Sequence, residues 1–189
     1  MVVNDKSLWV SVVKPYMEGD GKRPSRGMSV AGYDVTLSNR FLTMKRSKKP
    51  VVYGGKEPLW KPVEADTIVL YPNELMLAVT EEFFDMPKDK VGIVLGKSTW
   101  ARLGVLVNAT PLEPGWKGHI TIELSNLSPN PIRLIAGRGI GQVLLFDLAY
   151  PAEYEGIYQN QPKAPIPSCG QILRELEHIY EGWVRPTEK

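Results

Sequence analysis

Cysteine and histidine are scarce in this chain, which has one cysteine and two histidines among 189 residues. The single cysteine, Cys169, cannot form an internal disulfide, which agrees with a reducing compartment such as the cytoplasm. His119 and His178 lie far apart in the sequence, so a His/Cys/Cys zinc site has no support and a Cys–His nucleophilic pair is weak. We therefore expect a cytoplasmic protein that uses no zinc.

An excess of charge and a long apolar run are also missing. The formal net charge is +2, from 23 Lys and Arg against 21 Asp and Glu, so the balance does not demand nucleic acid or a membrane. Lys45, Arg46, Lys48 and Lys49 form one basic cluster, which reads more simply as a solvated loop than as a nucleic-acid patch. No charged-then-apolar leader opens the chain, and no apolar run approaches the roughly 18 residues of a membrane helix. The sequence predicts a soluble protein that binds neither nucleic acid nor membrane.

Glycine and proline are abundant, and they punctuate short runs with strand character. The 17 glycines and 16 prolines fall between these runs, as in β proteins with many turns. Strands are expected over 33–44 with a turn at Ser38-Asn39, over 67–87 on both sides of a Pro72-Asn73 turn, and over 90–96, 103–109, 119–126, 132–137 and 141–148. Close spacing of short strands with scarcely a helix predicts an all-β sandwich or barrel.

Helical patterns are confined to the two ends. A short helix is expected from Ser7 to a stop near Pro15. Residues 169–183 have helical spacing, with their apolar side chains on one face. Residues 149–168, rich in Pro, Gln and Tyr, predict an extended, mobile arm. We expect a main domain over 1–168 and a helical extension over 169–189.

A nucleotide-binding loop is suggested by the Gly-Lys-Ser-Thr sequence at 96–99, but its context differs from a P-loop. A P-loop has a glycine five positions before the Gly-Lys pair, where this chain has Val91. The residues that follow also have a strand pattern rather than a helical one. The match is therefore no evidence for a P-loop.

Two charged residues stand among apolar ones and admit two interpretations. Arg102 lies at the start of a strand pattern, where a surface arginine is the simpler interpretation. Glu123 shares one face of its predicted strand with Thr121 and Ser125, while Ile120, Ile122 and Leu124 lie opposite. That face is either a polar surface or the wall of a cleft in which a carboxylate transfers protons.

An ordered set of motifs resembles one enzyme family. The segments are AGYDVTLSNRF (31–41), GKSTWARLG (96–104), EPGWKGHITIELSN (113–126), AGRGIGQVLLF (136–146) and IYQNQPKAPIPS (157–168). They occur in the order found in dCTP deaminases, which share a trimeric β fold with the dUTPases. The resemblance runs from Gly32 to Ser168. It implies a dUTPase-like distorted β-barrel or jelly roll, assembled as a homotrimer with active sites at subunit interfaces.

The resemblance assigns the chemistry to Glu123, Arg102 and Ser98. It implies that dCTP is hydrolysed to dUTP and ammonia without zinc, with Glu123 as general base and acid for a water that attacks C4 of cytosine. Ser98 and Arg102 are expected to orient the base, the water and nearby phosphate oxygens. Plain dUTPases lack the equivalent of Glu123, so the resemblance favours deamination. Arg102 near Glu123 would keep the carboxylate ionised, whereas burial would raise its pKa.

The remaining site assignments concern the ends of the nucleotide. Phosphate binding is expected from Lys97, Ser98 and Thr99, with Mg²⁺ held by the triphosphate and not by protein ligands. Gln142 is expected near the site with a largely structural role, and Asp34 in the scaffold of the trimer centre. Further substrate contacts are assigned to Thr110, Glu113, Thr121, Ile122 and Arg102, and a lid to Tyr158, Gln159 and Gln161.

Three departures from the family pattern leave alternatives open. The segment NATPLEPGW (108–116) is two residues shorter than its family counterpart, so Thr110 or Pro111 is expected to supply the carbonyl that contacts the catalytic water. Glu113 replaces the aspartate used where the triphosphate is also cleaved. Ile157 replaces a phosphate-binding lysine, for which Lys163 is a less favoured substitute. The alternatives are a dUTPase or bifunctional enzyme that releases pyrophosphate, and a nucleotide-binding protein without catalysis.

Overall fold

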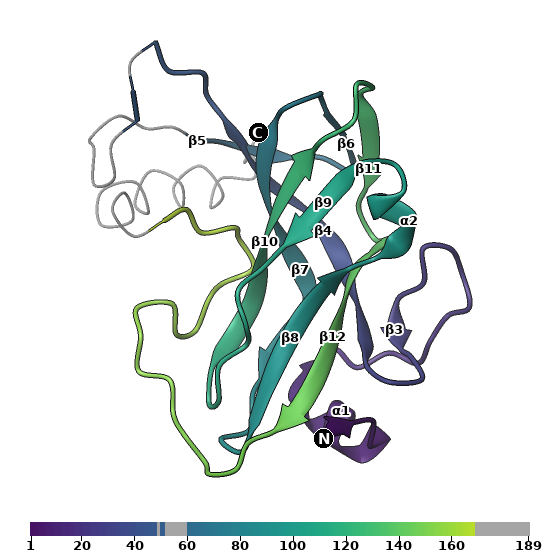
Figure 1. Cartoon of the computed structure of the whole chain (residues 1–189), viewed down its shortest axis with the longest axis vertical. Helices are drawn as coiled ribbons and strands as arrows, with labels where there is room; N and C mark the ends of the chain where they lie inside the picture. The colour runs from purple at the N-terminus through teal and green to yellow at the C-terminus, as the bar shows by residue number, and fades with distance from the viewer. Residues whose placement is uncertain (49, 52–59, 169–189) are drawn as a thin grey trace, which may run out of the picture.

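The computed structural model describes residues 1–48, 50–51 and 60–168, and the predicted C-terminal extension over 169–189 lies outside the described residues. Figure 1 shows strands curled around a core, with short helices at the periphery. The helices are α1 (Lys6–Val12) and α2 (Ser98–Ala101), and the strands are β1 (Val2–Val3), β2 (Val13–Lys14), β3 (Gly27–Met28), β4 (Tyr33–Met44), β5 (Trp60–Glu64), β6 (Thr67–Leu70), β7 (Leu75–Asp85), β8 (Lys90–Gly96), β9 (Val105–Asn108), β10 (Lys117–Asn126), β11 (Ile132–Ile135) and β12 (Gly139–Asp147).

The main sheet has the order β1-β12-β4-β7-β10-β9, and further strands pair with its members. β8 adds to β12, β5 and β3 to β4, and β2 to β7, while β6 and β11 form a separate pair. The curled sheet encloses large side chains with no exposed surface, among them Trp9, Tyr33, Phe41, Phe84 and Leu124. The predicted all-β, barrel-like class is confirmed, because strands of the curled sheet enclose a large cluster of buried apolar side chains.

The predicted N-terminal helix is confirmed as α1, which begins one residue earlier than expected. The side chain of Asp5 accepts a hydrogen bond of 2.8 Å from the backbone N–H of Ser7, which caps the helix start. Trp9 on this helix stacks on Tyr33, with ring centroids 5.9 Å apart. The helix ends at Val12, and the chain passes directly into β2.

The turn predicted at Ser38-Asn39 is wrong, because β4 runs without reversal from Tyr33 to Met44. Leu37 pairs with Thr80 and Phe41 with Ala78, so residues 38–40 form a bulge opposite one residue of β7. The backbone N–H of Arg40 donates to the hydroxyl of Ser38 at 3.2 Å, a local bond typical of turn residues. The signal for irregular backbone was therefore correct, but a β-bulge accommodates it within a continuous strand.

A second bulge lies beside the first, on β7. His119 of β10 pairs with Phe83 and Thr121 with Val79, so residues 80–82 of β7 stand opposite Ile120 alone. The hydroxyl of Thr80 accepts from the N–H of Ile120 at 3.0 Å and donates to the carbonyl of Glu82 at 2.8 Å. This side chain replaces the ladder bonds that the bulge interrupts.

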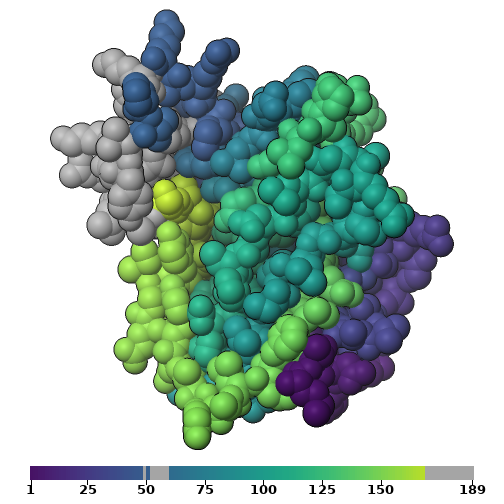
Figure 2. All heavy atoms as spheres, viewed as in Figure 1, coloured from purple at the N-terminus to yellow at the C-terminus, as the bar shows by residue number. Residues whose placement is uncertain are grey.

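The arm over 149–168 forms no strand or helix but lies along the barrel, beside β10 (Figure 1). Gln161 forms a parallel bridge with Gly118, and the N–H of His119 donates to the Gln161 carbonyl at 3.0 Å. In Figure 2 the yellow-green atoms of the arm make a layer on the flank of the barrel. The arm is extended as predicted, and its backbone is bonded to the edge of the barrel near the start of β10.

Candidate active site

Glu123 lies on β10 between two neighbouring strands. It pairs with Asn108 of β9 and with Leu77 of β7. Burial alternates along β10, so Thr121, Glu123 and Ser125 are partly exposed while Ile122 and Leu124 are fully buried. The period-two pattern is confirmed. It also shows that the side chain of Ile122, assigned to substrate binding, points into the core, so only its backbone can face the same side as Glu123.

Glu123 opens into a cavity of about 480 Å³. β10, the turn segment after β9 and the arm form its walls. Six of the residues that the sequence assigns to catalysis or substrate binding line this cavity: Thr110, Glu113, Thr121, Glu123, Tyr158 and Gln161. The rest of the wall is largely apolar, with the aromatic side chains of Trp60, Trp116 and Tyr154 beside aliphatic ones such as Leu112 and Ile120. A cavity with apolar walls and a few convergent polar groups is typical of a small-molecule site.

Burial raises the pKa of the Glu123 carboxyl above its ordinary value, and a hydrogen bond from Asn108 opposes this increase. The Asn108 amide donates to Glu123 Oε2 at 2.9 Å and orients the carboxyl group. A raised pKa makes a carboxyl group better suited both to accept a proton and to return it during a reaction. Asn108 was not assigned to the site, and its place opposite Glu123 depends on the pairing of β9 with β10.

The arm is fastened to the turn that closes the cavity. The indole N–H of Trp116 donates to the Tyr158 carbonyl at 2.7 Å. The amide oxygen of Gln159 accepts from the Lys117 N–H at 2.7 Å, and its NH₂ group donates to the Gly115 carbonyl at 3.0 Å. Gln159 therefore holds the arm on the turn and does not line the cavity, whereas Tyr158 and Gln161 do.

The predicted phosphate-binding residues lie in a second pocket, of about 620 Å³. Lys97, Ser98 and Thr99 line it together with the loop over 21–25. Lys97 Nζ lies 2.7 Å from Asp34 Oδ2, and the side chains are 13% and 5% exposed. Asp34 also accepts from the Ser25 hydroxyl at 2.7 Å and from the Gln142 amide at 3.1 Å. Asp34 and Gln142 therefore organise this pocket, and the Lys97 charge is balanced inside the chain.

Arg102 lies apart from Glu123 within one chain. It is exposed at the end of α2 and lines neither cavity. Val105, just after it, pairs with Asn126, while Asn108 pairs with Glu123. Arg102 therefore lies beyond the Val105 end of β9, whereas Glu123 lies opposite its Asn108 end, and the four residues from Val105 to Asn108 span about 10 Å. Within one chain, burial therefore raises the pKa of Glu123, and the charge of Arg102 does not oppose this increase.

No helix among the residues that the structure describes is long and apolar enough to cross a membrane. Within the same ranges, no three His, Cys, Asp or Glu residues lie together in a way that could hold a metal ion.

Comparison with known proteins agrees with the geometry. A family model described as dCTP deaminase-like matches residues 20–148. The dCTP deaminase of Sulfurovum sp. (strain NBC37-1) is 39% identical over 183 residues, covering 92% of this chain and 95% of that protein. The dCTP deaminase of Pseudomonas fluorescens (strain SBW25) is 39% identical over 157 residues, covering 79% and 84%.

The fold has also been seen in a solved structure. The crystal structure of 2'-deoxycytidine 5'-triphosphate deaminase from Agrobacterium tumefaciens matches with a TM-score of 0.60 at 16% sequence identity. The match covers 76% of this chain but only 47% of that one, so this chain spans about half of its length. The fold is shared, and the sequence matches extend the likeness to most of the chain. This chain belongs to the dCTP deaminase family.

Proposed function

We propose that this chain hydrolyses dCTP to dUTP and ammonia, with Glu123 as the proton carrier and without zinc. The observation that carries the proposal is Glu123 itself, a half-buried carboxyl with a raised pKa in a cavity with largely apolar walls. The 39% identity to a dCTP deaminase over 92% of the chain supports the substrate class.

The carboxyl group of Glu123 can carry both protons that the reaction transfers. Glu123 takes a proton from a water whose oxygen bonds to C4 of cytosine, and passes that proton to N3. The new hydroxyl at C4 then gives its proton, through Glu123, to the amino group. The C4–N4 bond breaks, ammonia leaves, and C4 keeps the oxygen as the carbonyl of uracil. Asn108 orients the carboxyl through its 2.9 Å hydrogen bond, so less reorganisation is needed at each transfer.

The active site is completed by a second subunit of a homotrimer. Glu123 and the pocket of Lys97, Ser98 and Thr99 open into separate cavities, and Arg102 reaches neither. A nucleoside bound beside Glu123 therefore meets its phosphate ligands, Ser98 and Arg102 on a neighbouring copy of the chain. Leu103 and Leu106, near Arg102, are each 52% exposed, which suits a surface covered by another subunit.

The substrate enters as the Mg²⁺ complex of the triphosphate. The second pocket offers hydroxyl groups and cationic side chains, and its carboxylate, Asp34, already pairs with Lys97. This donor set suits phosphate oxygens, so the metal is held by the nucleotide. Residues 1–168 form the catalytic domain with the arm over 149–168 as its lid, and 169–189 form an extension.

The test measures two products from purified protein incubated with dCTP and Mg²⁺. Ammonia without pyrophosphate is expected. Pyrophosphate release would instead assign Glu113 the role of the aspartate that it replaces, and tight binding with neither product would identify a non-catalytic binding protein.

The Glu123→Gln variant tests the catalytic role. Ammonia release should fall by more than about 1,000-fold, because the amide cannot carry the proton. Binding of dCTP should persist, which the fluorescence of Trp116 and Trp60 in the cavity can report. The control is Glu155→Gln, at an exposed position of the arm, which should keep wild-type activity. A Glu123→Gln protein with wild-type turnover would overturn the assignment.

A further inference from the structure

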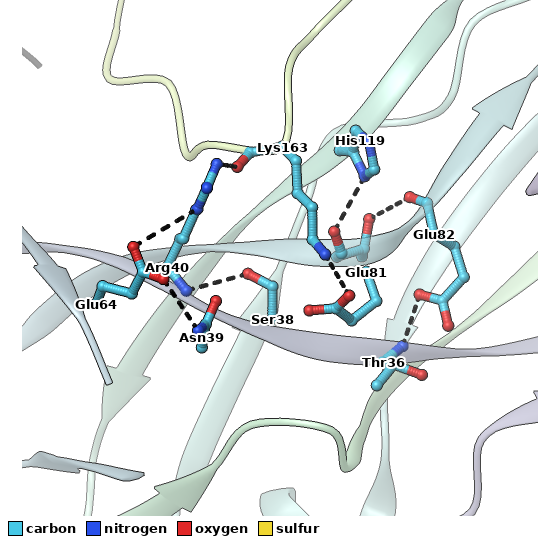
Figure 3. Close-up of polar contacts among 10 residues, drawn as sticks. Thr36, Ser38, Asn39, Arg40, Glu64, Glu81, Glu82, His119 and Lys163 are labelled. Carbon is cyan, nitrogen blue, oxygen red and sulfur yellow. Dashed lines mark hydrogen bonds and ion pairs between the residues drawn. The ribbon is translucent and has the colours of Figure 1, made fainter. Parts of the chain in front are cut away.

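The two neighbouring bulges of β4 and β7 turn a pair of opposite charges outward beside the arm. Arg40 belongs to the bulge of β4 over 38–40, and Glu81 to the bulge of β7 over 80–82. A bulge re-aims the side chains of a strand out of the regular alternation. Figure 3 shows Arg40 and Glu81 each in contact with Lys163 of the arm, whereas the carboxyl group of Glu82 lies at the backbone of Thr36.

Lys163 of the arm is held at both its side chain and its main chain. Its ammonium group pairs with Glu81 Oε2, and the side chains are 40% and 36% exposed. Arg40 Nη1 donates to the main-chain carbonyl of Lys163 at 2.9 Å, and Arg40 Nε lies 4.0 Å from Glu64 Oε2 (Figure 3). We call Arg40, Glu64, Glu81 and Lys163 the arm clasp. The ammonium group of Lys163 is thus engaged by Glu81.

The arm clasp lies between two segments of the arm that line the Glu123 cavity. Gln161, two residues earlier, lines the cavity and bonds through its backbone to β10. Ile166, three residues later, also lines it, and its N–H donates to the hydroxyl of Thr121 at 3.2 Å. The clasp is the place where charged side chains of the barrel hold the arm between these contacts.

We propose that Arg40, Glu81 and Lys163 are positioning residues that hold the arm over the Glu123 cavity, so that Gln161 and Ile166 close on the bound deoxycytidine nucleotide. The inference rests on the proposed function and deepens it. None of the three residues touches the reacting atoms. Their contribution is to reduce the freedom of the arm before substrate binds, which lowers the entropic cost of closing the site.

The experiment compares Lys163→Met with wild type in dCTP titrations and in amide hydrogen exchange. The variant should raise KM by about two- to fivefold, the range for a partly exposed ion pair, with a smaller change in kcat. Amides over 157–168 should exchange faster, because they open without unfolding of the barrel. The double variant Glu81→Lys with Lys163→Glu restores opposite charges and should recover most of the wild-type KM.

The matched control is Lys6→Met, which removes the exposed ion pair between Lys6 and Glu18 far from the arm and should leave KM unchanged. The inference would be overturned if the wild-type protein is active and the Lys163→Met variant keeps both the wild-type KM and the wild-type rates of amide hydrogen exchange in the arm. Wild-type protein that releases no ammonia would overturn the proposed function instead. In that case the exchange of the arm still tests the clasp, since exchange needs no turnover.

Discussion

Replacing Glu82 with glutamine should stabilise the folded protein at pH 8 and have little effect near pH 5. The Glu82 side chain is 2% exposed between β4 and β7, where Oε2 accepts the Thr36 N–H at 2.9 Å (Figure 3). Burial raises the pKa of this carboxyl from 4.5 to about 7. Glutamine keeps an oxygen that can accept the same hydrogen bond, and it has no charge to bury.

The magnitude follows from the two pKa values. The folded protein holds the proton of Glu82 up to about pH 7, and the unfolded chain only up to 4.5. Folding therefore takes up a proton between these values, and the free energy of unfolding falls as pH rises through this window. At about 1.4 kcal/mol for each pH unit, the penalty of the buried charge is about 3 kcal/mol at pH 8. Removing it should raise Tm by roughly 6–12 °C in a chain of this size.

The assay is urea unfolding of wild type and Glu82→Gln at pH 5, 6.5 and 8, at one fixed protein concentration. Burial lowers the pKa of His119, so the stability that His119 contributes is present above its unfolded pKa and is lost as pH falls. Because His119 is present in both proteins, its contribution cancels when the free energy of unfolding of wild type is subtracted from that of the variant at each pH. Glu155→Gln, at an exposed site, is the control. An equal difference between Glu82→Gln and wild type at pH 5 and pH 8 would refute the reasoning.

Two further predictions concern the trimer and the second pocket. The Arg102→Ala and Glu123→Gln proteins, each expected to be inactive, should regain ammonia release when they are unfolded together and refolded as a mixture. The reason is that some subunit interfaces then combine an intact Arg102 with an intact Glu123. Recovery no greater than that of either protein refolded alone would place both residues in the site of one subunit. Lys97→Met should lower the free energy of unfolding by about 3 kcal/mol, because it leaves Asp34, 5% exposed, without its counter-charge. Adding Asp34→Asn should recover much of that loss in thermal unfolding, and a double variant no more stable than Lys97→Met would contradict the role of the ion pair.

Much of the Glu123 cavity could be predicted from motifs and periodicity. The alternation along 119–126 placed Glu123 and Thr121 on one face, and the arm supplied Tyr158 and Gln161 as expected. Asn108 escaped prediction because its contact with Glu123 depends on how β9 pairs with β10, which no local pattern encodes.

Other features depend on what surrounds a residue, which local sequence does not specify. Ser38 and Asn39 favour irregular backbone equally in a turn and in a bulge, and the pairing of β4 with β7 selects the bulge. Ile122, assigned to substrate binding by the family resemblance, has its side chain in the core, so a contact with substrate would use its backbone. Lys97 was expected to bind phosphate, and only the fold reveals that Asp34 lies beside it.

The sequence by itself determined the β class, the order of the family motifs and the side of its strand on which Glu123 lies. These properties depend on composition and on periodicities of a few residues, which local chemistry controls. Only the tertiary structure decided which distant groups meet: Lys97 with Asp34, Lys163 with Glu81, and Glu123 with Asn108 but not with Arg102. The physical reason is that strand pairing and burial are properties of the assembled sheet, and they set both the contacts of a charge and its pKa.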